Sequence, residues 1–311
     1  MTADPRPPAP LRDFAVDTDF GRLAGLRSDG AGAPKVLALH GWLDNAASFV
    51  PLQPHLPRVE LVAADLPGHG ASAHLPLAAG YTVVNAARAM FALADALGWQ
   101  RFALLGHSLG AAVASVMAAA APQRIERLLA IEALGALVED EARSATRLQA
   151  AFAETRWSRR PLRVFGDIAD AVRARVQAGG IGEEAARLLV ERGIAPVRFD
   201  DRQGGFTWRS DPRLTRDTAV RMTEPQVRDL LRAIECPTRV IYAEPAQPYF
   251  PEALRRARFE CLRHGELVVI DGGHHLHMEQ PVAVAAAIGD FFLGQGGEST
   301  VQDAQPAAKP G

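Results

Sequence analysis

Short runs of apolar residues without alternating polar positions recur along the chain. They lie at 35–39, 59–64, 102–105, 128–131, 239–243 and 267–270. Such uninterrupted runs are typical of parallel strands that are buried on both faces of a sheet. Most of them are separated by segments with helical periodicity, at 46–56, 82–97, 109–121, 251–259 and 281–293. This alternation predicts a doubly wound α/β domain, in which ligands bind at the carboxyl ends of the strands.

Two segments depart from this alternation. Residues 14–27 alternate in polarity around a break at Gly21, which predicts an antiparallel hairpin. Between Gly135 and Cys236 the chain is charged, rich in Arg and Glu and mostly helical in pattern, with a loop at 200–212. We interpret this second segment as a helical insertion that the sheet carries as a cap or lid.

The insertion sets the expected domain boundaries. Residues 12–135 and 234–294 form one discontinuous core, and residues 136–233 form the cap. The tails, 1–11 and 295–311, are rich in small residues and proline, and we expect them to be disordered.

Composition narrows the function classes. The 311 residues include 34 Lys and Arg against 36 Asp and Glu, so no broad basic field is available for nucleic acid. A hydrophobic fraction of 48% excludes a mostly disordered chain. Two cysteines, Cys236 and Cys261, cannot form a disulfide framework and are expected to be reduced. The first ten residues resemble neither a signal peptide nor a membrane anchor, and no apolar stretch is long enough for a membrane span, so we expect a cytoplasmic protein.

The strongest chemical motif is Gly106-His107-Ser108-Leu109-Gly110. A bare G-x-S-x-G pattern is common, but here an apolar strand leads into it and a helix of small residues follows it. In this setting a serine occupies a sharp turn with its hydroxyl exposed. We therefore predict Ser108 as the nucleophile.

A serine nucleophile needs a base, and three histidines follow the last apolar strand in Gly272-Gly273-His274-His275-Leu276-His277. Serine first and histidine last is the order of an α/β-hydrolase. The glycine directly before His274 favours that ring, with His275 and His277 as packing residues or second choices. A His-x-His metal site is the competing interpretation, but no further ligand with suitable spacing accompanies the cluster, so we expect no metal.

An acid must orient the base. The loop after strand 239–243 contains Glu244 and no Asp, whereas strand 128–131 runs directly into Glu132. Glu132 is the first choice and Glu244 the second, and a salt bridge that anchors the insertion remains an alternative role for Glu132. Asp271 is assigned to turn formation.

The oxyanion of an acyl-transfer reaction needs two hydrogen-bond donors. The backbone N–H of Leu109, at a helix start, supplies one, and that of Trp42, after Gly41, supplies the second. Trp42 and His107 are the predicted substrate-contacting residues. Several loop residues are expected to frame the site without reacting, namely His40, Asp65, Gly68, His69 and Gly70.

Together these motifs resemble a known superfamily. LHGWLDNAASF, ADLPGHGAS, GHSLG and GGHHLHMEQP, in this order, resemble the α/β-hydrolases. The first motif and GFTWRSDPRLT are similar to the serine hydrolase-like, or kraken-like, proteins. The resemblance implies a mostly parallel eight-stranded sheet with helices on both faces and a cap after the sixth strand. It also implies a triad of Ser108, His274 and an acid. The missing Asp after strand 239–243 departs from the common pattern and is similar to relatives whose acid follows the sixth strand, which supports Glu132.

The expected function is that of a carboxylesterase-like serine hydrolase. Its partners would be water and a small, fairly apolar ester or lactone, without a cofactor. The same residues would also serve a C–C bond hydrolase or a cofactor-free perhydrolase, and a non-catalytic binding or signalling protein is the third possibility. Related dehalogenases and epoxide hydrolases use an Asp nucleophile, so Ser108 argues against both of those reactions. The aromatic residues considered as pocket lining, as a group, are Trp42, Phe49, Trp157, Phe165, Phe206 and Trp208.

Overall fold

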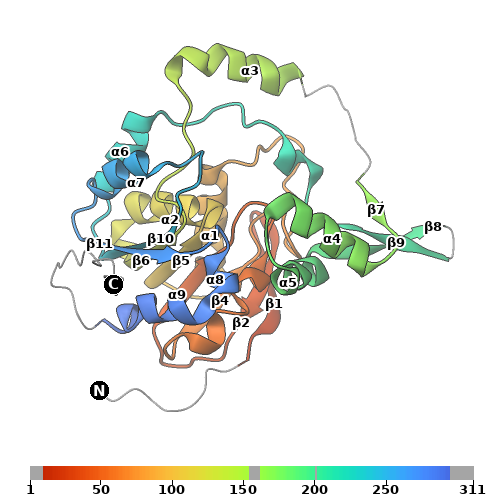
Figure 1. Ribbon diagram of the computed structural model, residues 1–311, viewed down its shortest axis with the longest axis horizontal. Coiled ribbons are helices and arrows are strands. Elements are labelled where there is room, and N and C mark those ends of the chain that lie inside the picture. The colour runs from red at the N-terminus through yellow and green to blue at the C-terminus, as the bar shows by residue number, and fades with distance from the viewer. Residues whose placement is uncertain (1–9, 154–161, 200–201, 295–311) are drawn as a thin grey trace, which may run out of the picture.

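A computed structural model describes residues 10–153, 162–199 and 202–294 (Figure 1). Its main sheet has eight strands in the order β1-β2-β4-β3-β5-β6-β10-β11. The strands are β1 (Arg12–Thr18), β2 (Gly21–Arg27), β3 (Lys35–Leu39), β4 (Glu60–Ala64), β5 (Phe102–His107), β6 (Ile125–Ile131), β10 (Thr238–Glu244) and β11 (Gly265–Asp271). The β1–β2 hairpin is antiparallel and joins β4 antiparallel, and every other pairing is parallel. The predicted fold class and the N-terminal hairpin are confirmed.

Apolar side chains cover both faces of this sheet. In β3, Leu37 and Leu39 face one hydrophobic cluster, and Val36 and Ala38 face the other. Figure 1 shows the helices on the two sides. The first cluster includes α1 (Val83–Ala96), α2 (Leu109–Ala120) and α6 (Glu224–Arg232), and α7 (Glu252–Phe259) packs beside it; the second includes α8 (Leu276–Glu279) and α9 (Pro281–Ile288). Burial on both faces explains the uninterrupted apolar runs.

The segment 46–56, expected to be one helix, instead forms two short 3₁₀ helices, η1 (Ala46–Phe49) and η2 (Gln53–His55). Pro51 and Pro54 explain this difference, because a proline lacks the backbone N–H that a continuous helix requires and clashes with the preceding turn. Single 3₁₀ turns also occur elsewhere, at η3 (Pro122–Arg124), η4 (Glu141–Arg143), η5 (Pro212–Thr215) and η6 (Phe291–Leu293).

The insertion after β6 contains helices and a small sheet. Its helices before α6 are α3 (Ser144–Ala153), α4 (Ile168–Gly179) and α5 (Glu183–Gly193), and its antiparallel sheet has the order β7-β9-β8. The strands are β7 (Val164–Phe165), β8 (Ile194–Phe199) and β9 (Arg202–Trp208). The prediction of a loop at 200–212 is therefore wrong for most of that range, because β9 occupies residues 202–208 and pairs with both β7 and β8. Phe206 and Trp208 pack on the buried cap cluster on alternate positions, a strand pattern that the glycines before them obscured.

The insertion is not uniformly separate from the core. In Figure 1, α4, α5 and the small sheet lie together beside the main sheet, whereas α3 stands apart from them. Helix α6, although within the predicted 136–233 cap, places Val227 and Leu231 in the core cluster that includes α2. The domain boundaries remain a prediction. The expected disorder of the tails falls largely outside the described residues, as does Trp157.

Candidate active site

Ser108 lies in the turn that joins β5 to α2. Its backbone has φ of 51° and ψ of −115°, which is unusual for a residue other than glycine. Neighbouring glycines permit the close approach of strand and helix: a Cβ on Gly110 would lie 1.9 Å from Leu39 O, and one on Gly106 would lie 2.4 Å from Ala111 Cα. The Ser108 side chain does not cap α2. These features are those of a nucleophile elbow, which presents the hydroxyl at the carboxyl edge of the sheet.

His274 and Glu132 meet at the same edge, although 142 positions separate them. His274 Nδ1 lies 3.1 Å from Glu132 Oε2. Glu132 directly follows β6 with φ of 59°, its N–H donates to Ile241 O, and its Oε1 accepts from Ala243 N at 2.6 Å. The Glu132 side chain is fully buried, whereas Glu244 is exposed at the end of β10. The acid in contact with His274 is thus the one at the end of the sixth strand.

Four histidine rings pack together behind this contact. The ring of His107 lies 4.9, 5.3 and 4.0 Å from those of His274, His275 and His277. Its Nε2 donates to His274 O at 2.8 Å, and His277 Nε2 lies 2.7 Å from Ser48 Oγ. Burial lowers the pKa of His277 to about 3 and that of His107 well below its ordinary value, so both rings are neutral near pH 7.

This packing changes the role expected for His107. Its side chain is buried, so in this structure it lies out of a substrate's reach. It supports the backbone of His274 instead. Trp42, the other residue expected to contact substrate, is 53% exposed, and its indole Nε1 donates to Leu214 O of the insertion at 3.0 Å.

The loop after β3 contains Trp42, the residue predicted to supply the second oxyanion donor. A Cβ on Gly41 would lie 2.9 Å from both Asp44 Oδ2 and His107 Nδ1, so a larger residue there would displace these buried side chains. Leu43 has φ of 59°, and Asp44 N donates to Gly41 O to close the turn. The backbone of Trp42 lies inside this turn, and that of Leu109 begins α2 next to Ser108.

Asp44 anchors this loop to two other elements. Its Oδ1 pairs with Arg175 of α4, and its Oδ2 lies 3.4 Å from His275 Nε2. No hydrogen-bond donor of the described residues is aligned with Oδ2, so we regard the His275 contact as electrostatic. Burial raises the pKa of Asp44, but His275 and Arg175 outweigh it, and the net pKa lies well below its ordinary value. Sequence reasoning missed this role, although Asp44 stands within the quoted motif.

The residues assigned to framing do hold loops. His40 Nε2 accepts from Leu66 N at 3.0 Å, which joins the loops after β3 and β4. Asp65 accepts from Ala46 N and Ala71 N, and Arg192 of α5 pairs with it. These contacts link the loops after β3 and β4 with the cap.

The aromatic residues proposed as pocket lining occupy other places. Phe49 is fully buried in the core beneath η1, and Phe165 is buried within the cap. Trp208 packs on the cap cluster and also lines a narrow hollow between cap and core, next to Asn45 and Arg175. Tyr249, which the sequence did not single out, is 56% exposed and places its Oη 3.4 Å from His274 Nδ1.

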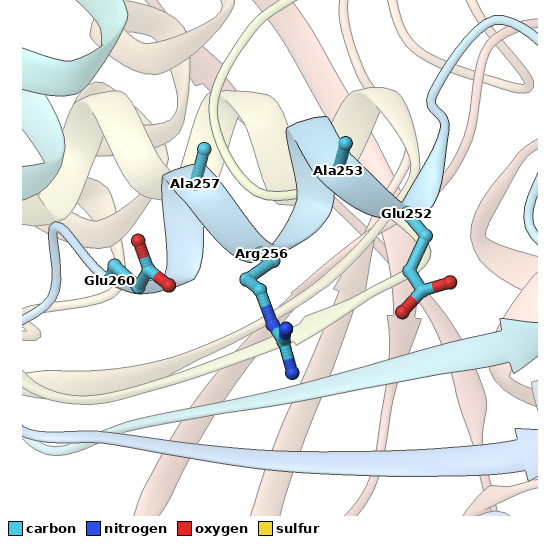
Figure 2. Close-up of a pocket in the computed structure, with 5 residues that line it drawn as sticks. All are labelled: Glu252, Ala253, Arg256, Ala257 and Glu260. Atoms are coloured by element: carbon cyan, nitrogen blue, oxygen red, sulfur yellow. The ribbon is translucent and has the colours of Figure 1, made fainter.

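An open surface hollow lies elsewhere, along α7. Figure 2 shows that its lining comes from one helix, with Arg256 between Glu252 and Glu260. It contains none of the predicted catalytic residues. Within 10–153, 162–199 and 202–294, no group of three or more His, Cys, Asp or Glu side chains could hold a metal ion. Over the same ranges no helix combines the length and apolarity needed to cross a membrane. Both cysteines are free.

Comparisons with known proteins agree with this fold. A family model described as the alpha/beta hydrolase fold matches residues 34–281. A serine hydrolase-like protein of Dictyostelium discoideum is 29% identical, over 83% of this chain and 75% of its own. A serine hydrolase-like protein of Danio rerio is 26% identical, over 93% and 90%. The crystal structure of a hypothetical protein of Pseudomonas aeruginosa PAO1 superposes with a TM-score of 0.84 at 37% identity, covering 90% of this chain and 99% of that one. This chain belongs to the α/β-hydrolase fold family.

Proposed function

We propose that this protein is a serine hydrolase that cleaves small, fairly apolar carboxylic esters or lactones through an acyl-enzyme on Ser108. The observation that carries the proposal is the 3.1 Å contact between His274 Nδ1 and the buried Glu132 carboxylate, at the sheet edge where Ser108 is held in its strained turn. An acid in this contact fixes the ring so that Nε2 is free to act as the base.

The reaction proceeds in two steps. His274 Nε2 takes the Ser108 hydroxyl proton as Oγ attacks the ester carbonyl carbon. The N–H groups of Trp42 and Leu109 donate to the resulting oxyanion. Collapse breaks the bond to the alcohol, which leaves with the proton from His274. Water then loses a proton to His274 and attacks the acyl group, and the acid is released as Ser108 regains its proton.

Exposed aromatic side chains support an apolar substrate. Trp42 and Tyr249 are both more than half exposed. Trp42 lies in the loop after β3, which we propose supplies an oxyanion donor, and Tyr249 lies beside His274. Exposed aromatic rings next to a reactive centre favour apolar acyl or alcohol groups. The other described residues around the base and the acid are mostly buried and do not offer such surfaces.

A fluorophosphonate probe tests the nucleophile. The native protein should become labelled, and Ser108→Ala should abolish both labelling and hydrolysis because no other described serine lies in this turn. Ser144→Ala, at the exposed start of α3, is the matched control and should label like the native protein. A folded native protein that resists the probe would contradict the proposal.

A series of p-nitrophenyl esters of increasing chain length tests the bond. Turnover of acetate to butyrate esters supports ester hydrolysis. Probe labelling without ester turnover would instead favour C–C bond hydrolysis or perhydrolysis, which use the same residues. Neither labelling nor turnover would favour a non-catalytic binding protein.

A further inference from the structure

Arg255 of α7 extends its guanidinium into the protein behind the Glu132 carboxylate. Its Nη2 lies 3.3 Å from Oε1 and 3.5 Å from Oε2. Nη1 donates to Ala243 O at 2.7 Å, and Nε donates to Phe250 O at 3.0 Å. The guanidinium also lies 4.6 Å from the centre of the Tyr242 ring. These contacts fix a buried cation against the same carboxylate that contacts His274.

The same backbone carbonyl and amide connect the two partners. Ala243 donates its N–H to Glu132 Oε1 and accepts from Arg255 Nη1 with its carbonyl. The acid, the arginine and the end of β10 therefore form one rigid unit. A buried carboxylate without such a partner would be costly to keep ionised, and a protonated Glu132 could not stabilise a charged His274.

We propose, on the basis of the proposed hydrolase function, that Arg255 is a positioning residue that keeps Glu132 ionised and sets the lower pH limit of activity. Arg255 and Glu132 place opposite charges 3.3 Å apart. A proton on His274 adds a second cation to this unit. Without the Arg255 charge, the Glu132–His274 pair would therefore bind this proton more tightly. His274 would then be free to act as the base only at higher pH.

The other titratable side chains next to His274 are not expected to set the lower pH limit of activity. Tyr249 is uncharged near pH 7, since burial and the nearby Glu132 raise its pKa. His107, packed against the ring from β5, is neutral because burial lowers its pKa. His275 contacts the His274 ring on the same loop, and its carboxylate partner Asp44 is paired with the cap residue Arg175.

Arg258, one turn along α7, provides a matched control. Both arginines are buried, and both guanidinium groups lie within 5.7 Å of the Phe250 ring centre. Arg258 pairs with Glu224 of α6 and donates to Leu134 O, and within the described part of the chain it makes no hydrogen bond or ion pair with Glu132. A variant at Arg258 therefore removes a comparable buried cation without changing the contact to the acid.

The test is the pH dependence of kcat/KM for a p-nitrophenyl ester from about pH 5 to about pH 9. Arg255→Met should shift the acid limb, the low-pH side of this profile, upward by about one pH unit. Relative to the native protein, the variant should then lose roughly tenfold more activity at pH 6 than it loses on the plateau. Arg255→Lys retains the cation and should keep the limb within a few tenths of a unit. Arg258→Met should lower stability but leave the limb in place.

If Arg255→Met folds, either of two outcomes would overturn the proposal while leaving the hydrolase function intact. One is an unshifted acid limb in a folded, active Arg255→Met, which would make Arg255 a purely structural residue. The other is an equal shift in Arg258→Met. If Arg255→Met does not fold, an upward shift in Arg255→Lys would itself contradict the proposal, because the charge is still present. Failure of the native protein to react with the fluorophosphonate would instead refute the proposed function.

Discussion

Two buried carboxylates in this protein have nearly the same set of partners. Glu132 contacts His274 and an arginine of the core helix α7. Asp44 contacts the adjacent His275 and Arg175 of the cap helix α4. Both carboxylate side chains are at most 1% exposed. A carboxylate, a histidine and an arginine in mutual contact are therefore not by themselves a sign of catalysis.

The two groups of residues, one around Glu132 and one around Asp44, differ in the exposure of the histidine and in the parts of the structure that they join. The side chain of His274 is 22% exposed, and that of His275 is 8% exposed. Glu132 Oε1 and Oε2 both face donors, whereas Asp44 Oδ2 has no aligned hydrogen-bond donor among the described residues. The residues around Glu132 hold an accessible ring, and those around Asp44 join the loop after β3 to the cap. In the proposed mechanism, access to the imidazole, rather than the set of its partners, separates the base His274 from the structural His275.

Replacing each histidine in turn should give the largest difference in activity between the two groups of residues. His274→Gln is expected to lower kcat/KM about 10⁴-fold or more, because the base is lost. His275→Gln should lower it less than about tenfold, since that ring reaches Asp44 and not the substrate. Ester turnover by both purified variants measures the difference. Equal losses would show that His275 also belongs to the catalytic set.

Replacing the two carboxylates should separate activity from stability. Glu132→Gln is expected to lower kcat by roughly 10²- to 10⁴-fold, as the wrong tautomer of His274 is then favoured. Asp44→Asn should retain activity within about tenfold but destabilise the fold by about 3 kcal/mol, because Arg175 loses its buried partner.

Denaturant unfolding at pH 7 measures the stability change of these variants. The pKa of Asp44 is lowered in the folded protein, so its contribution is complete above the ordinary pKa of 3.8 and declines only as pH falls below it. The expected loss is therefore present in full at pH 7. A stable but inactive Asp44→Asn would reverse the two roles.

The smallest effect that we predict is a change in the pH dependence of stability. It concerns the neutral histidines packed behind the residues around Glu132 and Asp44. Burial lowers the pKa of His277 from 6.5 to about 3, so between these values the unfolded chain binds a proton that the folded chain does not. Stability is complete above about pH 6.5 and falls as pH decreases. His277→Gln should reduce this slope by roughly 1.4 kcal/mol per pH unit, measured by urea unfolding at several pH values. The exposed His264→Gln is the control and should leave the slope unchanged.

Short stretches of sequence were enough to predict most of the strands of the main sheet and the motifs at their ends. The G-x-S-x-G motif between a strand and a helix placed Ser108, and the carboxyl end of β6 placed Glu132, because parallel strands bring their ends to one edge. The hairpin β8–β9 was missed because Gly204 and Gly205 mask its alternation. Arg255 could not be found in this way, since its contact with Glu132 spans 123 positions and no local pattern distinguishes it from Arg258.

Three residues other than glycine have positive φ in the described part of the chain: Leu43, Ser108 and Glu132. They lie in the loops that follow β3, β5 and β6, and two of them, Ser108 and Glu132, carry the proposed chemistry. A conformation of this kind costs roughly 1–3 kcal/mol per residue, which the surrounding fold must offset. Selection for thermal stability alone would therefore favour glycine at all three positions. At Ser108 and Glu132, whose side chains the proposed reaction requires, function therefore opposes stability, whatever the substrate is.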